Sequence, residues 1–118
     1  MSKPIGPYTP VVRAGDWLIV SGQVGAKEGA LVGGGLQAEV TQAVANLAER
    51  LGEAGASLDD VVKTTVFMTH MRDYDLMNEA YTAAFGSNRP ARSAVAVVEL
   101  PLYALVEIEA WAYVGDDS

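Results

Sequence analysis

The chain has 118 residues, 50% of them hydrophobic and 19% charged, which predicts a single globular domain over residues 1–118. Its formal net charge is −7 and its eight Lys and Arg residues are scattered, which argues against nucleic acid as the main partner, because phosphates are neutralised by clustered basic side chains. The absence of cysteine excludes a disulfide framework, a thiolate metal site and a cysteine nucleophile.

The N-terminal segment MSKPIGPYTP lacks the apolar stretch of a signal peptide, and no apolar run in the chain is long enough to span a bilayer. We therefore expect a cytoplasmic protein without membrane contact. Tyr8 lies between Pro7 and Pro10 in this segment. Its ring either packs on the edge of the core or is held by the stiff loop to hydrogen-bond a ligand.

Residues 17–24, WLIVSGQV, have the composition of a strand and are the first element that we predict. Gly22 interrupts this apolar run, and a glycine there marks either a bulge or a place where a ligand approaches the backbone. Residues 25–35 contain five glycines between short apolar pairs and predict a hairpin-like excursion.

Apolar residues recur at helical spacing over residues 36–54, and Gly55 is a plausible residue for ending that helix. Residues 61–68, VVKTTVFM, are rich in β-branched side chains and predict a strand. His70, the one histidine, is interpreted as a surface residue of the following loop, since no cluster of further metal ligands is visible.

Asp73 is in position to cap a second helix, whose apolar spacing continues to Phe85 and stops at Gly86. Asn78 lies beside the apolar positions of this helix and needs a partner. The amide either bonds to a loop backbone or helps to shape a pocket.

The last two predicted strands, joined around Pro101, are RPARSAVAVVELP (89–101) and VEIEAWAYV (106–114). Arg92 is either a surface residue at a strand end or a guanidinium that binds a carboxylate through two parallel hydrogen bonds. The small neighbours of Arg92, among them Ala94, would leave room for such a ligand. Glu107 shares a strand face with aromatic side chains, so it either faces solvent or forms part of a pocket wall as a general base.

The predicted order, strand, excursion, helix, strand, helix and two strands, is an α+β arrangement in which two helices can cover only one face of the sheet. Both faces of the last strands carry apolar side chains. The uncovered face must therefore be buried elsewhere, and a second copy of the chain is the simplest cover. We expect an oligomer.

A direct hairpin between the last two strands would place Arg92 opposite residues 112–113. Arg92 and Glu107 would then be separated by about 20 Å along the sheet, at about 3.3 Å per residue. In that arrangement the two side chains could meet around one small molecule only across a subunit boundary.

These segments together resemble the RidA/YjgF family, also called the L-PSP or translation-inhibitor family. The resemblance extends over nearly the whole chain and rests on IGPYTPVV at 5–12, VSGQV at 20–24, the spacing of Gln42 and Asn46, AGASLDDVVKTTVFMTHMRDYDLMNEAY at 54–81, PARSAVAV at 90–97, LP at 100–101 and VEIEAWA at 106–112. No nucleotide-binding glycine motif and no cluster of metal ligands is visible in the sequence, so neither a cofactor nor a metal is expected.

The resemblance implies a chorismate-mutase-like fold assembled as a homotrimer, with ligand sites in clefts between subunits. It also implies hydrolysis of reactive enamines and imines, such as 2-aminoacrylate, to 2-keto acids and ammonia. Arg92 would bind the substrate carboxylate and Glu107 would act on the attacking water.

In the same picture Tyr8 would line the cleft, and Asn78 with the backbone near Gly22 and Ala94 would shape it. The chain departs from the family at Ala94, where many members have cysteine, which bears on the preferred substrate. Two other functions stay open from the sequence: a sensor that binds 2-keto acids without turnover, and the endoribonuclease activity attributed to some relatives.

Overall fold

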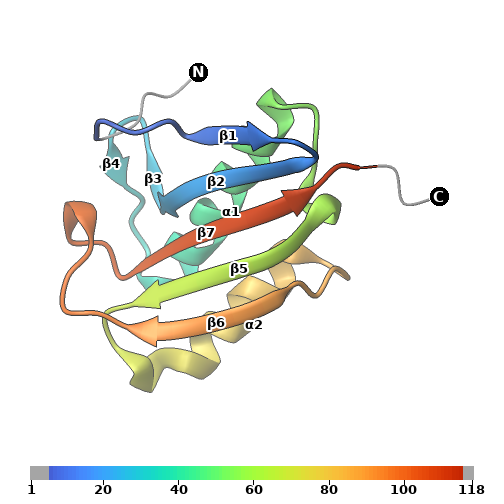
Figure 1. Ribbon diagram of the computed structural model, residues 1–118. Coiled ribbons are helices and arrows are strands. Elements are labelled where there is room, and N and C mark those ends of the chain that lie inside the picture. The colour runs from blue at the N-terminus through green and yellow to red at the C-terminus, as the bar shows by residue number, and fades with distance from the viewer. Residues whose placement is uncertain (1–5, 116–118) are drawn as a thin grey trace.

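A computed structural model describes residues 6–115 as a mixed five-stranded sheet with strand order β1-β2-β7-β5-β6, accompanied by a small two-stranded sheet. The helices α1 (Leu36–Glu53) and α2 (Tyr74–Phe85) cover the same face of the large sheet (Figure 1). The expected α+β class with two helices on one face is confirmed. Within the described part of the chain, no helix is long and apolar enough to cross a membrane.

The N-terminal half contains one strand more than the sequence predicts. Strand β1 (Val11–Ala14) pairs antiparallel with β2 (Trp17–Val24), and Gly15, with φ 60°, makes the tight turn between them. Only four residues long, β1 lacks a periodic signal of its own. The predicted strand 17–24 is confirmed, and the excursion forms β3 (Ala26–Lys27) and β4 (Ala30–Leu31), which pair with each other.

The predicted helices are also confirmed, with one correction at a helix start. Gly55 and Gly86, with φ of 81° and 71°, follow α1 and α2 and allow the chain to leave each helix. Asp73 precedes α2, but its side chain accepts no capping hydrogen bond. A 3₁₀ turn at Met71–Asp73 leads directly into α2, so Asp73 does not have the extended backbone of a capping residue.

The last two strands do not form the direct hairpin that the estimate of the distance between Arg92 and Glu107 assumed. Strand β5 (Val61–Met68) lies between them, paired parallel with β6 (Ala91–Ala96) and antiparallel with β7 (Val106–Tyr113). The segment after β6, which contains the 3₁₀ turn Pro101–Tyr103, is long enough to pass the end of β5 before β7 begins. Strand β7 thereby lies at the centre of the sheet, between β2 and β5.

The hydrophobic core lies between the helices and one face of the sheet. Alternate residues of β7, from Val106 to Ala112, are fully buried against α1, α2 and the inward side chains of β2 and β5. The opposite face, which we call the open face, carries no helix. Its residues include Val12, Trp17, Val95 and Trp111, which are 45%, 38%, 42% and 40% exposed. The predicted apolar uncovered face is therefore present in the chain.

Candidate functional site

A pocket of about 470 Å³ opens on the open face of the sheet around Glu107. It is formed by β2, β5, β7, the N-terminal segment and the loop at Pro101. The lining residues are Gly6, Tyr8, Ser21, Gly22, Phe67, Pro101, Glu107 and Glu109. Three residues singled out from the sequence, Tyr8, Gly22 and Glu107, thus lie together.

Glu107 is half-buried and lines this pocket beside Phe67, its partner in the pairing of β5 with β7. Gly22 lies against its carboxyl group, since a Cβ added at Gly22 would be 2.7 Å from the Glu107 Cδ. The close approach of a neighbouring group explains why the strand has glycine here. The register between β2 and β7 also shifts between Val20 and Gln23, so the predicted bulge is observed, and the group that lies close to the Gly22 backbone in the chain is the Glu107 side chain.

Burial raises the pKa of Glu107 above its ordinary value, and the neighbouring carboxylate of Glu109 raises it further. The ionised form of Glu107 is therefore a stronger base than a carboxylate in water. Raised carboxylate pKa values in a pocket are typical of general bases.

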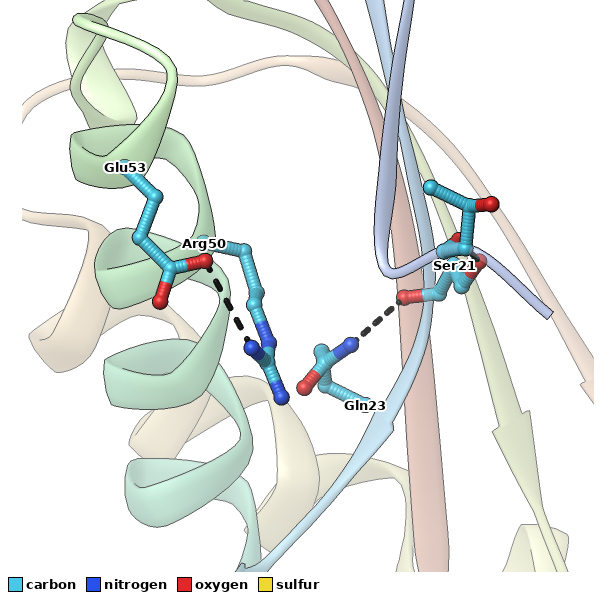
Figure 2. A network of polar contacts seen from close by, with 5 residues as sticks. Ser21, Gln23, Arg50 and Glu53 are labelled. Carbon is cyan, nitrogen blue, oxygen red and sulfur yellow. Dashed lines mark hydrogen bonds and ion pairs between the residues drawn. The ribbon is translucent and has the colours of Figure 1, made fainter. Parts of the chain in front are cut away.

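A polar network holds the N-terminal segment and the Gly22 region together (Figure 2). Ser21 Oγ donates a hydrogen bond to the Thr9 carbonyl at 2.7 Å, and the Ser21 N–H donates to the Pro10 carbonyl at 2.9 Å. The buried amide of Gln23 donates to the Ser21 carbonyl at 3.0 Å. These bonds tie the segment carrying Tyr8 to the strand that forms the side of the pocket.

The network continues toward helix α1. In Figure 2 the guanidinium of Arg50 points from α1 toward the Gln23 amide, and its Nη1 lies 3.5 Å from Glu53 Oε1. Arg50 is 5% exposed, so this cation is held inside the protein.

Arg92 lies elsewhere, at the edge strand β6 on the face covered by helix α2. Its guanidinium carbon is 4.9 Å from the centre of the Tyr81 ring and 5.5 Å from the centre of the Tyr74 ring. Nη2 donates a hydrogen bond to the Tyr74 hydroxyl at 2.9 Å, and Nη1 approaches Met77 Sδ at 3.8 Å. The rings and the hydrogen bond fix the position of the cation.

Tyr81 is itself fixed. Its hydroxyl and the buried Thr64 Oγ1 are 2.6 Å apart, and its ring lies 4.6 Å from that of Phe85. Burial raises the pKa of Tyr81, an effect opposed by the Thr64 hydrogen bond and by the charge of Arg92. The neutral phenol thus gives Arg92 an aromatic face without a competing negative charge.

Arg92 has no carboxylate partner within residues 6–115. The ion pairs in this range are Arg13 with Asp16 and Arg50 with Glu53. A half-buried guanidinium without an acid partner, in a chain with a net charge of −7, is available to an anion from outside.

Ala94 and Asn78 also lie on the helix-covered side of the sheet. Ala94 is two residues after Arg92 on β6, facing the same way, and pairs with Val66. The Asn78 Oδ1 on α2 is buried without a hydrogen-bond partner among the described residues, so the expected bond from a loop backbone to this oxygen is absent. Asn78 contributes instead to a shallow hollow of about 490 Å³ on the surface of α2.

Within one chain, Arg92 and Glu107 point to opposite faces of the sheet. Thr64 pairs with both Arg92 and Ala110, and these residues face the core, whereas Glu107 pairs with Phe67 on the open face. Arg92 is level with Ala110, so it lies about 10 Å from Glu107 along the strands and two strand spacings, about 10 Å, across them. The expected separation of about 20 Å along the sheet is wrong, because it assumed the hairpin.

Sequence reasoning did not find Tyr74, Tyr81 or Phe67 as site residues. The two tyrosines belong to the apolar spacing of α2, and the sequence assigned them no further role. Seven residues apart on a helix, they share one face, and this was the available signal. That this face meets Arg92 depends on the parallel pairing of β5 and β6. His70 is exposed as predicted, and residues 6–115 contain no group of potential metal ligands.

Comparison with known proteins gives matches over nearly the whole chain. Residues 1–114 match the family described as Endoribonuclease L-PSP. The chain is 44% identical to the 2-iminobutanoate/2-iminopropanoate deaminase of Mus musculus over 94% of its length and 84% of the relative.

Two solved structures share the fold. The crystal structure of RidA from the Antarctic bacterium Psychrobacter sp. PAMC 21119 has a TM-score of 0.89 and 35% identity, covering 94% of this chain and 91% of that one. The structure of E. coli TdcF with bound serine has a TM-score of 0.85 and 32% identity, covering 93% and 90%.

Proposed function

We propose that this chain hydrolyses 2-imino and 2-enamino acids to 2-keto acids and ammonia, because it belongs to the endoribonuclease L-PSP family, also called RidA/YjgF. The deaminase relative supports this reaction class. The observation that carries the proposal is Arg92, a half-buried cation positioned by two aromatic rings and without an acid partner among residues 6–115.

Arg92 would bind the substrate carboxylate. A guanidinium can form two parallel hydrogen bonds with a carboxylate, and it is more selective for this planar group than an ammonium ion. The relative TdcF has been crystallised with serine, which carries the same carboxylate and a nitrogen on the adjacent carbon. Asn78 and Ala94 would shape the space around the bound molecule from the same side of the sheet.

Glu107 would act on water. An enamine first becomes an imine by gaining a proton at its β-carbon and losing one from its nitrogen. Ionised Glu107 then takes a proton from water while the water oxygen bonds to the imine carbon and the C=N electron pair moves to nitrogen, giving a tetrahedral adduct. Glu107 returns its proton to nitrogen, and the hydroxyl proton of the adduct is also transferred to nitrogen, so the C–N bond breaks as the carbonyl forms, releasing ammonia and the 2-keto acid. No cofactor is needed, and Tyr8 and Gly22 would enclose the water.

The complete site would require two copies of the chain, because Arg92 and Glu107 face opposite sides of one sheet. We propose a homotrimer in which the Glu107 pocket of one copy meets the β6 edge of the next. The apolar open face supports this assembly, since Trp17 and Trp111 lie there in ring contact at 6.0 Å and remain about two-fifths exposed in the single chain.

The reaction can be tested by coupling the protein to a dehydratase that generates 2-aminoacrylate and following keto-acid formation. We expect acceleration by the natural sequence, none by Arg92→Ala, and full acceleration by Arg13→Ala. Arg13 is a matched control because it lies on β1 in a surface ion pair with Asp16. Equal activity of Arg92→Ala and the natural sequence would exclude this mechanism.

The shared site has a separate test. Arg92→Ala and Glu107→Gln chains, each inactive alone, are denatured together in equal amounts and refolded. If each site takes Arg92 from one copy and Glu107 from its neighbour, random mixing restores about a quarter of the sites. No recovered activity in mixed trimers would mean that each site is formed within one chain.

Two alternatives are distinguished by the same samples. A keto-acid sensor would bind 2-oxobutanoate through Arg92 without accelerating hydrolysis. An endoribonuclease, as the family description suggests, would cleave RNA in an activity that survives repeated purification. The net charge of −7 argues against RNA binding, since that charge repels phosphate.

A further inference from the structure

Tyr74 supplies an unused hydrogen-bond donor beside Arg92. Its hydroxyl oxygen lies 2.9 Å from Arg92 Nη2, at the first residue of α2. Arginine has five N–H donors and no acceptor, so the phenol oxygen must accept this bond. The Tyr74 proton cannot point back to the guanidinium and is directed elsewhere.

No acceptor for the Tyr74 proton is found among residues 6–115, where the Arg92 contact is the one hydrogen bond of this hydroxyl. Tyr74 is 39% exposed, so a small molecule can reach it. Acceptance of a hydrogen bond from a cation also polarises the phenol and makes its O–H a better donor. The remaining N–H groups of the guanidinium and the phenol O–H are thus adjacent donors without an acceptor among residues 6–115.

We infer that Tyr74 is a specificity-determining residue, whose hydroxyl donates a hydrogen bond to the carboxylate that Arg92 binds. This inference rests on the carboxylate binding proposed for Arg92. Two of the five Arg92 N–H groups are directed to Tyr74 and Met77, so three are left for the ligand. A carboxylate has about four acceptor positions and can accept from Arg92 and Tyr74 together.

Removal of the Tyr74 hydroxyl should cause a loss of binding rather than a loss of chemistry. Tyr74 holds the carboxylate end of the substrate, whereas water attacks the adjacent carbon from the Glu107 side. Loss of the hydroxyl should weaken ground state and transition state equally, which raises KM and leaves kcat unchanged. A hydrogen bond to a charged group makes the expected weakening about tenfold.

The test compares Tyr74→Phe with the natural sequence and with Tyr113→Phe, as trimers of matched thermal stability. Tyr113→Phe is a suitable control because it also removes one phenol hydroxyl. Tyr113 is the last residue of β7 and does not line the Glu107 pocket. Binding is measured by titration with 2-oxobutanoate and with propanoate, which keeps the carboxylate but lacks the 2-oxo group. Hydrolysis of 2-iminobutanoate gives kcat and KM.

We expect Tyr74→Phe to bind both ligands about tenfold more weakly, with kcat unchanged, and Tyr113→Phe to match the natural sequence. Four results would overturn the inference. Tyr74→Phe could bind both ligands as well as the natural sequence does, or lose affinity for 2-oxobutanoate alone. Tyr113→Phe could lose as much affinity as Tyr74→Phe, or Tyr74→Phe could show a lower kcat at unchanged KM. If 2-oxobutanoate binding depends on Tyr74 but no chain hydrolyses the imine, the inference stands and the proposed reaction fails. If the imine is hydrolysed but binding does not depend on Tyr74, the proposed reaction stands and the inference fails.

Discussion

The substitution Gly22→Ala tests whether the position of the Glu107 carboxyl group matters for catalysis. An alanine Cβ at this residue would lie 2.7 Å from the Glu107 Cδ and 2.9 Å from both Cγ and Oε2. All three atoms belong to one side chain. No backbone atom is among them, so the conflict can be relieved by moving Glu107 alone.

The size of that movement follows from the distances. Ordinary contacts of a Cβ atom begin at 3.4 Å, so the Glu107 carboxyl carbon must retreat by about 0.7 Å, the difference between 3.4 and 2.7 Å. A misplacement of about 1 Å can cost about 100-fold in rate. We therefore expect keto-acid formation to fall about 10- to 100-fold, or about 1.4 to 2.8 kcal/mol of transition-state stabilisation.

Folding should change little in comparison, by less than about 1 kcal/mol, because a half-buried side chain can adjust its rotamer. The matched control is Gly52→Ala in helix α1, where an added Cβ meets nothing within 4 Å. Alanine near the C-terminal end of the helix should stabilise the chain by at most about 0.5–1 kcal/mol and leave the rate unchanged.

The assay is imine hydrolysis at saturating substrate, with urea unfolding of the same samples. Full activity in Gly22→Ala would refute the assigned role of the Glu107 position. A large loss of stability would instead show that the new methyl group displaces the strands.

Three further predictions concern Arg92, Glu107 and the hydrogen bond between Thr64 and Tyr81. Arg92→Lys should keep the charge but lose the paired hydrogen bonds, so 2-oxobutanoate binding should weaken by about 2 kcal/mol in calorimetry; unchanged affinity would contradict bidentate binding. The pKa of Glu107 is higher in the folded chain than its ordinary value of 4.5. Protonated Glu107 therefore adds to the free energy of unfolding below pH 4.5, and this contribution is lost as the pH rises through the pKa of the folded chain. Glu107→Gln should therefore have a higher free energy of unfolding than the natural sequence at pH 7 but not at pH 4, measured in urea, and a lower value at pH 7 would contradict the sign. Thr64→Val removes the 2.6 Å partner of the buried Tyr81 hydroxyl and should cost about 1–3 kcal/mol in urea unfolding, and a neutral effect would show that this hydroxyl finds another partner.

Elements with strong local signals could be predicted from the sequence. The β-branched run of β5 and the helical spacing of α1 and α2 give their boundaries to within a residue or two, and glycines with positive φ end both helices. The short strand β1 could not be predicted in this way. Its four residues are stabilised by pairing with β2, which is a tertiary effect that local pattern does not contain.

Strand pairing was the main failure. Two neighbouring strands in sequence favour a hairpin, and nothing local in residues 97–105 shows that the chain passes the end of β5 instead. The error affected the site, because Arg92 faces α2 only when β6 pairs parallel with β5. Tyr74 and Tyr81 were for this reason not recognised as neighbours of Arg92, although their spacing on one helix face was visible.

The opposite orientations of Arg92 and Glu107 have a chemical consequence for the single chain. On one face, the positive charge of Arg92 would act on the Glu107 carboxylate without the sheet between them, and it would favour the ionised form and lower the pKa of Glu107. Their separation instead leaves Arg92 without an acid partner among residues 6–115 and leaves Glu107 with a raised pKa. In the proposed trimer the two approach each other only across a subunit contact, where the substrate lies between them. The anion that neutralises Arg92 is then the substrate carboxylate, and Glu107 keeps the basicity needed to act on water.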